Sequence, residues 1–195
     1  VGRLAARRGL PLVSGGARGV DQLAMDAAFE AGGAVVGILA ESLSRKLKCP
    51  DVRRAVYDGA TVMCTPYSPD APFSPGNAMG RNKLIYAQAA LTVVIASDTG
   101  TGGTWSGATE ALKRGFGAVA VWRGDGEGPG NESLQQLGAA PVSSIEDIES
   151  VLDAPPPVIT EPSPVPNSSR SSPKRCPASG RGAAGLARGS MPLSR

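Results

Sequence analysis

The sequence of 195 residues contains no histidine. Histidine is the usual general base near neutral pH and a frequent zinc ligand, so its absence excludes a Ser-His-Asp triad, a Cys-His dyad and the common zinc sites from this chain alone. The three cysteines, Cys49, Cys64 and Cys176, are too few and too widely spaced for a disulfide framework. We therefore expect neither a metal site nor a cofactor.

Aromatic residues and long apolar runs are also scarce. With 4% aromatic residues, an extended platform for stacking nucleic-acid bases is not expected. No apolar stretch approaches the roughly 20 residues that a membrane-spanning helix needs, and no signal peptide is recognisable. On these grounds we expect a soluble, cytoplasmic protein.

Composition divides the chain at about residue 154. Residues 155–195 are rich in Pro, Ser, Arg, Gly and Ala, so we expect a disordered tail behind one folded domain, residues 1–154. The tail holds six basic residues and one acidic residue, a net charge of +5, and residues 1–154 hold fourteen basic and sixteen acidic residues, a net charge of −2. Affinity for nucleic acid must then come from a local basic patch or from the tail, which can equally be a featureless solvated segment.

Residues 1–154 alternate between apolar segments typical of strands and amphipathic segments typical of helices, which predicts an α/β fold on a parallel sheet. The predicted strands are 11–13, 34–39, 60–64, 91–96 and 118–122. The predicted helices are 1–8, 20–31, 51–58, one that starts near residue 80, 104–114, 132–137 and 144–152. Four prolines between residues 66 and 79 predict a long irregular loop before the helix near residue 80.

Two glycine-rich turns join a predicted strand to a predicted helix. Glycines there let the backbone approach a ligand closely, and the first N–H groups of the following helix attract anions, of which phosphate is the most common. The candidate binding residues of these turns are Ser14, Gly15, Gly16, Ala17, Arg18, Gly19, Gly102, Gly103 and Thr104. Each turn could also be a plain tight connection. Two such turns on one sheet predict a shared ligand edge.

These turns, together with the motif Arg81-Asn82-Lys83-Leu84-Ile85, resemble the DNA-processing protein DprA family in order and spacing. The resemblance covers about residues 1–142 and ends in Gly130-Asn131-Glu132-Ser133-Leu134. It implies a Rossmann-like domain that binds single-stranded DNA, forms a homodimer and helps to load the recombinase RecA during natural transformation, without catalysis.

The chain departs from the family pattern at several positions. Met25 stands where the family usually has histidine, Lys83 where arginine is common, and Trp122-Arg123 where proline-glycine is usual. The first strand of the family fold, which is normally central, is also absent. We therefore expect a fragment or a late start of the chain, with unpaired backbone groups in the sheet.

The three residues Arg81, Asn82 and Lys83 are expected at the start of a helix, where basic side chains favour an anionic ligand. Arg81 suits bidentate contact with phosphate. Surface charge without a ligand is the alternative for the two basic residues, and helix capping is the alternative for Asn82.

Other polar and aromatic side chains near the turns have two interpretations each. Arg18 can contact phosphate or pair with an acid of its own fold. Asp21 is expected to support the helix dipole and to hold either Arg18 or a loop N–H. Thr104 can bind phosphate or cap its helix. Trp105 and Tyr86 can stack on bases, although packing in the core is more common.

Two further functions remain open from the sequence. The superfamily also contains nucleotide-binding sensors and phosphoribohydrolases that act on nucleoside monophosphates, for which Glu110 is the nearest candidate acid, at a longer spacing than expected. A pure interaction protein, in which the glycine turns are structural, is the third possibility.

Overall fold

The computed structural model describes residues 1–154. The predicted disordered tail, residues 155–195, and Cys176 lie outside the described residues. None of the helices between residues 1 and 154 combines the length and apolarity that crossing a bilayer requires.

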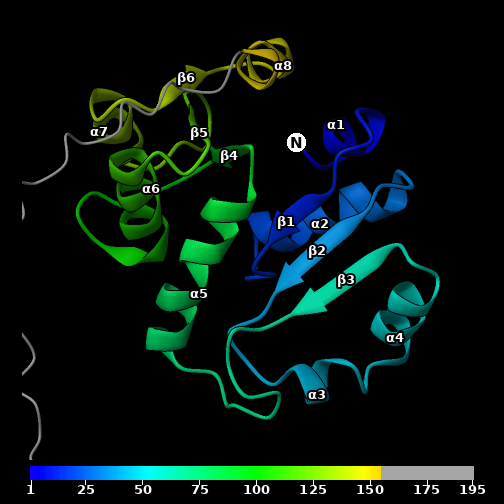
Figure 1. The fold of residues 1–195 in the computed structure, drawn as a ribbon. Coiled ribbons are helices and arrows are strands. Elements are labelled where there is room, and N and C mark those ends of the chain that lie inside the picture. The colour runs from blue at the N-terminus through cyan, green and yellow to red at the C-terminus, as the bar shows by residue number, and fades with distance from the viewer. Residues whose placement is uncertain (155–195) are drawn as a thin grey trace, which may run out of the picture. The chain divides into compact units, whose positions relative to one another are not determined.

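Helices and parallel strands alternate along the described residues, which confirms the predicted α/β fold (Figure 1). The strands are β1 (Leu12–Ser14), β2 (Val35–Ile38), β3 (Thr61–Cys64), β4 (Leu91–Val94), β5 (Ala118–Trp122) and β6 (Ala140–Val142). The helices are α1 (Gly2–Arg7), α2 (Val20–Glu30), α3 (Leu43–Lys46), α4 (Pro50–Tyr57), α5 (Pro75–Gln88), α6 (Gly102–Arg114), α7 (Asn131–Gln136) and α8 (Ile145–Asp153).

The strands form two sheets of three instead of one continuous sheet. The first sheet has the order β1-β2-β3 and the second sheet has the order β4-β5-β6, and every pairing in both is parallel. In the described residues, β1 and β4 therefore have one strand neighbour each.

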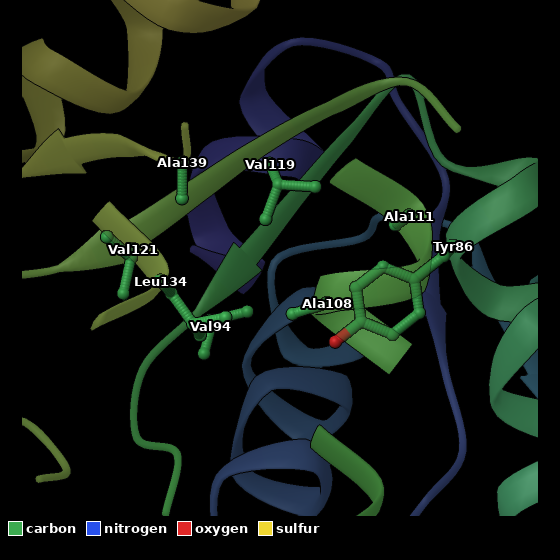
Figure 2. Close-up of a cluster of buried hydrophobic side chains, with 8 residues drawn as sticks. All are labelled: Tyr86, Val94, Ala108, Ala111, Val119, Val121, Leu134 and Ala139. Atoms are coloured by element: carbon green, nitrogen blue, oxygen red, sulfur yellow. The ribbon is translucent and has the colours of Figure 1, made fainter. Parts of the chain in front are cut away.

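Apolar side chains pack on both faces of the second sheet. Figure 2 shows one cluster, in which Tyr86 of α5 and Ala108 and Ala111 of α6 lie with valines of β4 and β5. The other cluster contains Leu4 of α1 and Ile148 of α8. The alternation of side chains along β5 explains both clusters, because successive residues of a strand face opposite sides of the sheet.

The start of α5 corrects the prediction from sequence. The helix begins at Pro75, five residues before Gly80, because proline is tolerated in the first helical turn and the Ser74 Oγ accepts a hydrogen bond from the Asn77 N–H (3.0 Å). Helix α3 and strand β6 were also not predicted. Both are short, and β6 contains Pro141, which argues against a strand in a sequence.

Candidate functional site

The first glycine turn, residues 14–19, follows the carboxyl end of β1. Gly16 and Gly19 have φ values of 64° and 95°, which other residues adopt only with strain. The Gly16 N–H donates to Ser14 Oγ (3.3 Å) and the Ala17 N–H donates to the Asp21 carboxylate (3.4 Å). Asp21 therefore holds a loop N–H, as expected. No side chain caps the start of α2, which leaves its N-terminus open to an anion.

Arg81 lies under this turn, and not at the start of a helix. It occupies the middle of α5 with 6% of its surface exposed. Its Nη1 donates to the Ile38 carbonyl oxygen (2.5 Å), and its Nε is buried with no partner in residues 1–154. A Cβ atom at Gly15 would collide with the guanidinium, so any other residue there would displace the Arg81 side chain. Burial lowers the pKa of Arg81, and the nearby Asp21 carboxylate acts in the opposite direction.

Asn82, the next residue, contacts the second glycine turn. Its Nδ2 donates to the Gly103 carbonyl oxygen (3.2 Å), and a Cβ atom at Gly103 would lie 2.9 Å from the same nitrogen. Asn82 does not cap its own helix, because Ser74 has that position. Consecutive residues of α5 therefore contact both glycine turns.

The second glycine turn, residues 97–104, follows β4. Gly100 and Gly102 have φ values of 74° and 83°. Thr104 is the third residue of α6, and Thr101 occupies the cap position, so the prediction of Thr104 as a cap was wrong. The Thr104 carbonyl oxygen accepts a hydrogen bond from the Tyr86 hydroxyl (3.2 Å). This bond ties α5 to the first turn of α6.

Asn131 is a positioning residue that the sequence reasoning missed. It is fully buried, its Oδ1 accepts from the Ser97 N–H (2.9 Å), and its Nδ2 donates to the carbonyl oxygens of Ile95 and Trp122 (2.8 Å each). A polar residue at the start of a short helix beside an apolar strand was the available signal. Asn131 fixes where the second glycine turn leaves the sheet.

The exposed basic side chains Arg18 and Lys83 differ in their ion pairs. Arg18 is exposed and makes no ion pair within residues 1–154. Lys83 pairs with Glu110 of α6 (3.2 Å), and Glu110 also pairs with Arg114 (2.9 Å). Arg18 is thus the free cation of the first turn in the described residues.

The aromatic side chains nearest the turns serve the core. Tyr86 is buried in the cluster on the second sheet, and Trp105 packs against that cluster while half-buried. Burial raises the pKa of Tyr86 to about 12. Of the two expected roles, base stacking and core packing, Tyr86 therefore has the second.

A cleft of about 580 Å³, here called the central cleft, lies between β1 and β4. Of the predicted site residues, those that line it are Ser14, Gly15, Ala17, Arg18, Asn82 and Thr104. The others, Gly16, Gly19, Arg81, Lys83, Gly102 and Gly103, do not line it. The two glycine turns follow the carboxyl ends of β1 and β4, where ligands of open parallel sheets bind. No group of three metal-ligating side chains is found in the described part of the chain.

Two solved structures with a similar fold are described as DNA processing protein A. The structure of DNA processing protein A (DprA) from Streptococcus pneumoniae matches with a TM-score of 0.57 at 23% identity, over 76% of this chain and 56% of that chain. The structure of DNA processing protein A from Helicobacter pylori, described by its single-stranded DNA binding mode, matches with a TM-score of 0.59 at 24% identity, over 77% of this chain and 69% of that chain. No curated protein matches the sequence.

A family model that matches most of the chain identifies its family. The sequence model of the family described as DNA recombination-mediator protein A matches residues 1–153, which include both glycine turns, α5 and both sheets. The resemblance seen in the sequence motifs is confirmed: the chain belongs to the DNA recombination-mediator protein A family.

Proposed function

We propose that the chain binds single-stranded DNA without catalysis, with backbone phosphates at the two glycine turns. The observation that carries the proposal is that Arg81 and Asn82, adjacent on α5, contact one turn each and bring both to the same end of the central cleft. The H. pylori relative is described as a single-stranded DNA-binding protein, which supports the same ligand here.

Local geometry has to provide the attraction, because residues 1–154 carry a net charge of −2. The N-terminus of α2, which no side chain caps, and Arg18, which makes no ion pair within residues 1–154, provide a positive site at the first turn. Arg81 stays under Gly15, where its buried charge adds to the potential and holds the turn against β2 through Ile38. Phosphate contacts of this kind predict binding that weakens with salt.

A small-nucleotide hydrolase is the alternative that the same turns allow. Its candidate acid, Glu110, is engaged by Lys83 and Arg114 within 3.2 Å. Both carboxylate oxygens of Glu110 are engaged in these ion pairs, which leaves neither free to contact a nucleotide or an attacking water. This arrangement favours a binding protein over a hydrolase.

Two partners are part of the proposal. The family name describes recombination mediators, so we propose that the DNA-bound chain assists a RecA-type recombinase and acts as a homodimer in the cytoplasm. Strand-exchange assays with and without the chain, and sedimentation of the chain alone, test these two points separately.

The deciding experiment titrates a labelled oligothymidylate of about 20 nucleotides against the chain at two salt concentrations, beside AMP and ATP. We expect salt-dependent binding of the oligonucleotide and no turnover of either nucleotide. Arg18→Ala should weaken binding several-fold, whereas Arg53→Ala, which removes an exposed arginine of α4, should not. Tight binding or hydrolysis of AMP without oligonucleotide binding would overturn the proposal.

A second pair of variants tests the backbone of the first turn. Gly15→Ala places a methyl group against the Arg81 guanidinium, whereas Gly76→Ala meets nothing closer than 3.9 Å. We expect the first variant to lose oligonucleotide binding and the second to keep it. Equal binding by both folded variants would remove the first turn from the site.

A further inference from the structure

Positive charge is concentrated in one stretch of the chain, residues 42–50. This stretch holds three basic residues and no acidic residue, whereas the other residues of 1–154 hold eleven basic and sixteen acidic residues, a net charge of −5. The three are here called the α3 basic cluster, because two lie on α3 and one lies two residues after its end: Arg45, Lys46 and Lys48. A local excess of positive charge on an acidic domain is the electrostatic signature of a surface that binds phosphates.

The side chains of the α3 basic cluster are accessible to a ligand. The Arg45 side chain is 81% exposed, and its pair with Glu41 (3.3 Å) is a surface ion pair, which contributes little stability. Lys46 is half-buried and Lys48 is exposed, and neither makes an ion pair within residues 1–154. Arg45 and Lys46 also lie in the last turn of α3, where cations suit the helix dipole. Lys48 lies beyond that turn, so the dipole does not account for the whole cluster.

The α3 basic cluster follows the same edge of the first sheet as the first glycine turn. Ser14, the last residue of β1, is in register with Gly37 of β2, so both strands end at one edge. The Arg81 guanidinium contacts both ends there, because it lies against Gly15 and donates to the Ile38 carbonyl oxygen. Only four residues separate Ile38 from α3, and Figure 1 shows the chain running from the tip of β2 into that helix. A nucleic-acid strand bound at the first turn therefore reaches the cluster by continuing along this edge.

Hydrogen bonds hold α3 in place at this edge. The Ser42 Oγ accepts from the Arg45 N–H (3.1 Å) at the start of the helix and donates to the Pro69 carbonyl oxygen (3.1 Å). The Ser44 N–H donates to the same oxygen (3.0 Å), and Pro69 belongs to the loop between β3 and α5. The connection after β2 is thus tied to the connection after β3. A ligand of the cluster meets a segment whose backbone is already ordered, which lowers the entropic cost of binding.

We propose that the α3 basic cluster is a second phosphate-binding surface, which extends the path of single-stranded DNA from the first glycine turn along the carboxyl edge of the first sheet. The inference rests on the proposed binding of DNA at the glycine turns and adds a further part of the same interface. Exposed lysine and arginine side chains suit the phosphates of a strand, which recur whatever its sequence. Residues 124–154, beyond β5, hold seven acidic residues and no basic residue. Charge therefore directs the strand across the first sheet and away from that segment.

The test compares two triple variants of the full 195-residue chain that lose the same charge. The first variant removes the cluster: Arg45→Gln, Lys46→Gln and Lys48→Gln. The second variant removes three exposed arginines of α1 and α4 that make no ion pair within residues 1–154: Arg3→Gln, Arg7→Gln and Arg53→Gln. Binding of a labelled oligothymidylate of about 20 nucleotides is measured at several salt concentrations.

We expect the cluster variant to bind several-fold more weakly than the charge-matched variant. The slope of log affinity against log salt concentration should also become shallower by about 2, because each phosphate contact of a single strand contributes about 0.7. The double variant Lys46→Arg and Lys48→Arg keeps the charges and should bind like the parent chain.

A footprint on the parent chain locates the strand independently of affinity. Cys49 is exposed and directly follows Lys48, so bound oligonucleotide should slow its alkylation by iodoacetamide several-fold, as measured by mass spectrometry of the peptide that contains it. An unchanged rate at saturating oligonucleotide, or equal affinities of the two triple variants, would remove α3 from the interface and leave the glycine turns in it. If Arg18→Ala also bound like the parent chain, the proposed function would fail with it. Protection of Cys49 by polyglutamate as strong as that by the oligonucleotide would assign the cluster to acidic protein segments and contradict the proposal.

Discussion

The two sheets have the same size and the same parallel pairing, but they differ in how they are held. Both apolar clusters lie on the second sheet, where β5 is buried between two neighbours. The first sheet buries Val35 and Ile38 of β2 but exposes Val62 of β3. Buried Arg81 donates to the Ile38 carbonyl oxygen at the end of this sheet that carries the glycine turn. The second sheet thus carries both apolar clusters, whereas the end of the first sheet that carries the glycine turn is held by a buried polar side chain.

Leu134→Ala tests the stability of the second sheet and has the largest expected effect. Leu134 is 0% exposed, and its truncation should lower the free energy of unfolding by about 2–5 kcal/mol. Urea denaturation followed by circular dichroism measures the change. Leu23→Ala makes the same change on α2, which packs on the first sheet, at a side chain that is 69% exposed, and should stay within about 0.5 kcal/mol. Equal losses from both variants would contradict the comparison.

Arg81→Ala tests the polar contact that holds the first sheet. The substitution leaves the Ile38 carbonyl without its donor, so we expect a loss of about 1–3 kcal/mol in the free energy of unfolding together with weaker oligonucleotide binding. A surface arginine that only contacts phosphate would lose binding alone. Arg81→Lys keeps the charge without the planar guanidinium and should recover binding only in part. If Arg81→Ala unfolded with the same free energy as the parent chain, Arg81 would not stabilise the first sheet, and only the phosphate contact expected from the sequence would remain for it.

The same arginine shows where sequence reasoning succeeded and failed. The alternation of elements, the bounds of β5 and the two glycine turns followed from local patterns, because glycine and apolar periodicity act within a few residues. The position of Arg81 did not follow, because Pro75 was taken to break a helix that it starts. Five additional residues moved Arg81 from the first turn of α5 to its buried middle. Burial depends on contacts between distant segments, which local patterns do not contain.

Tyr86→Phe tests the contact between α5 and the second sheet through its pH dependence. Burial raises the pKa of Tyr86 to about 12, above the ordinary value of 10. The stabilisation is therefore complete below pH 10 and is lost as the pH rises through 12, with a loss of about 1 kcal/mol at pH 11. Unfolding by urea at pH 9 and pH 11 should show a larger loss for the parent chain than for Tyr86→Phe. Identical losses would mean that Tyr86 ionises as easily in the folded chain as in the unfolded chain.

Removal of residues 155–195 has the smallest expected effect on stability and tests whether the two sheets are sufficient. The segment has little apolar surface to bury, so the melting temperature of residues 1–154 should match that of the full chain within a few degrees. Its net charge of +5 still acts on DNA, and its removal should reduce the salt dependence of oligonucleotide binding without abolishing binding. A large fall in melting temperature would place a stabilising contact beyond residue 154. Complete loss of binding would move the DNA site from the glycine turns to the basic tail.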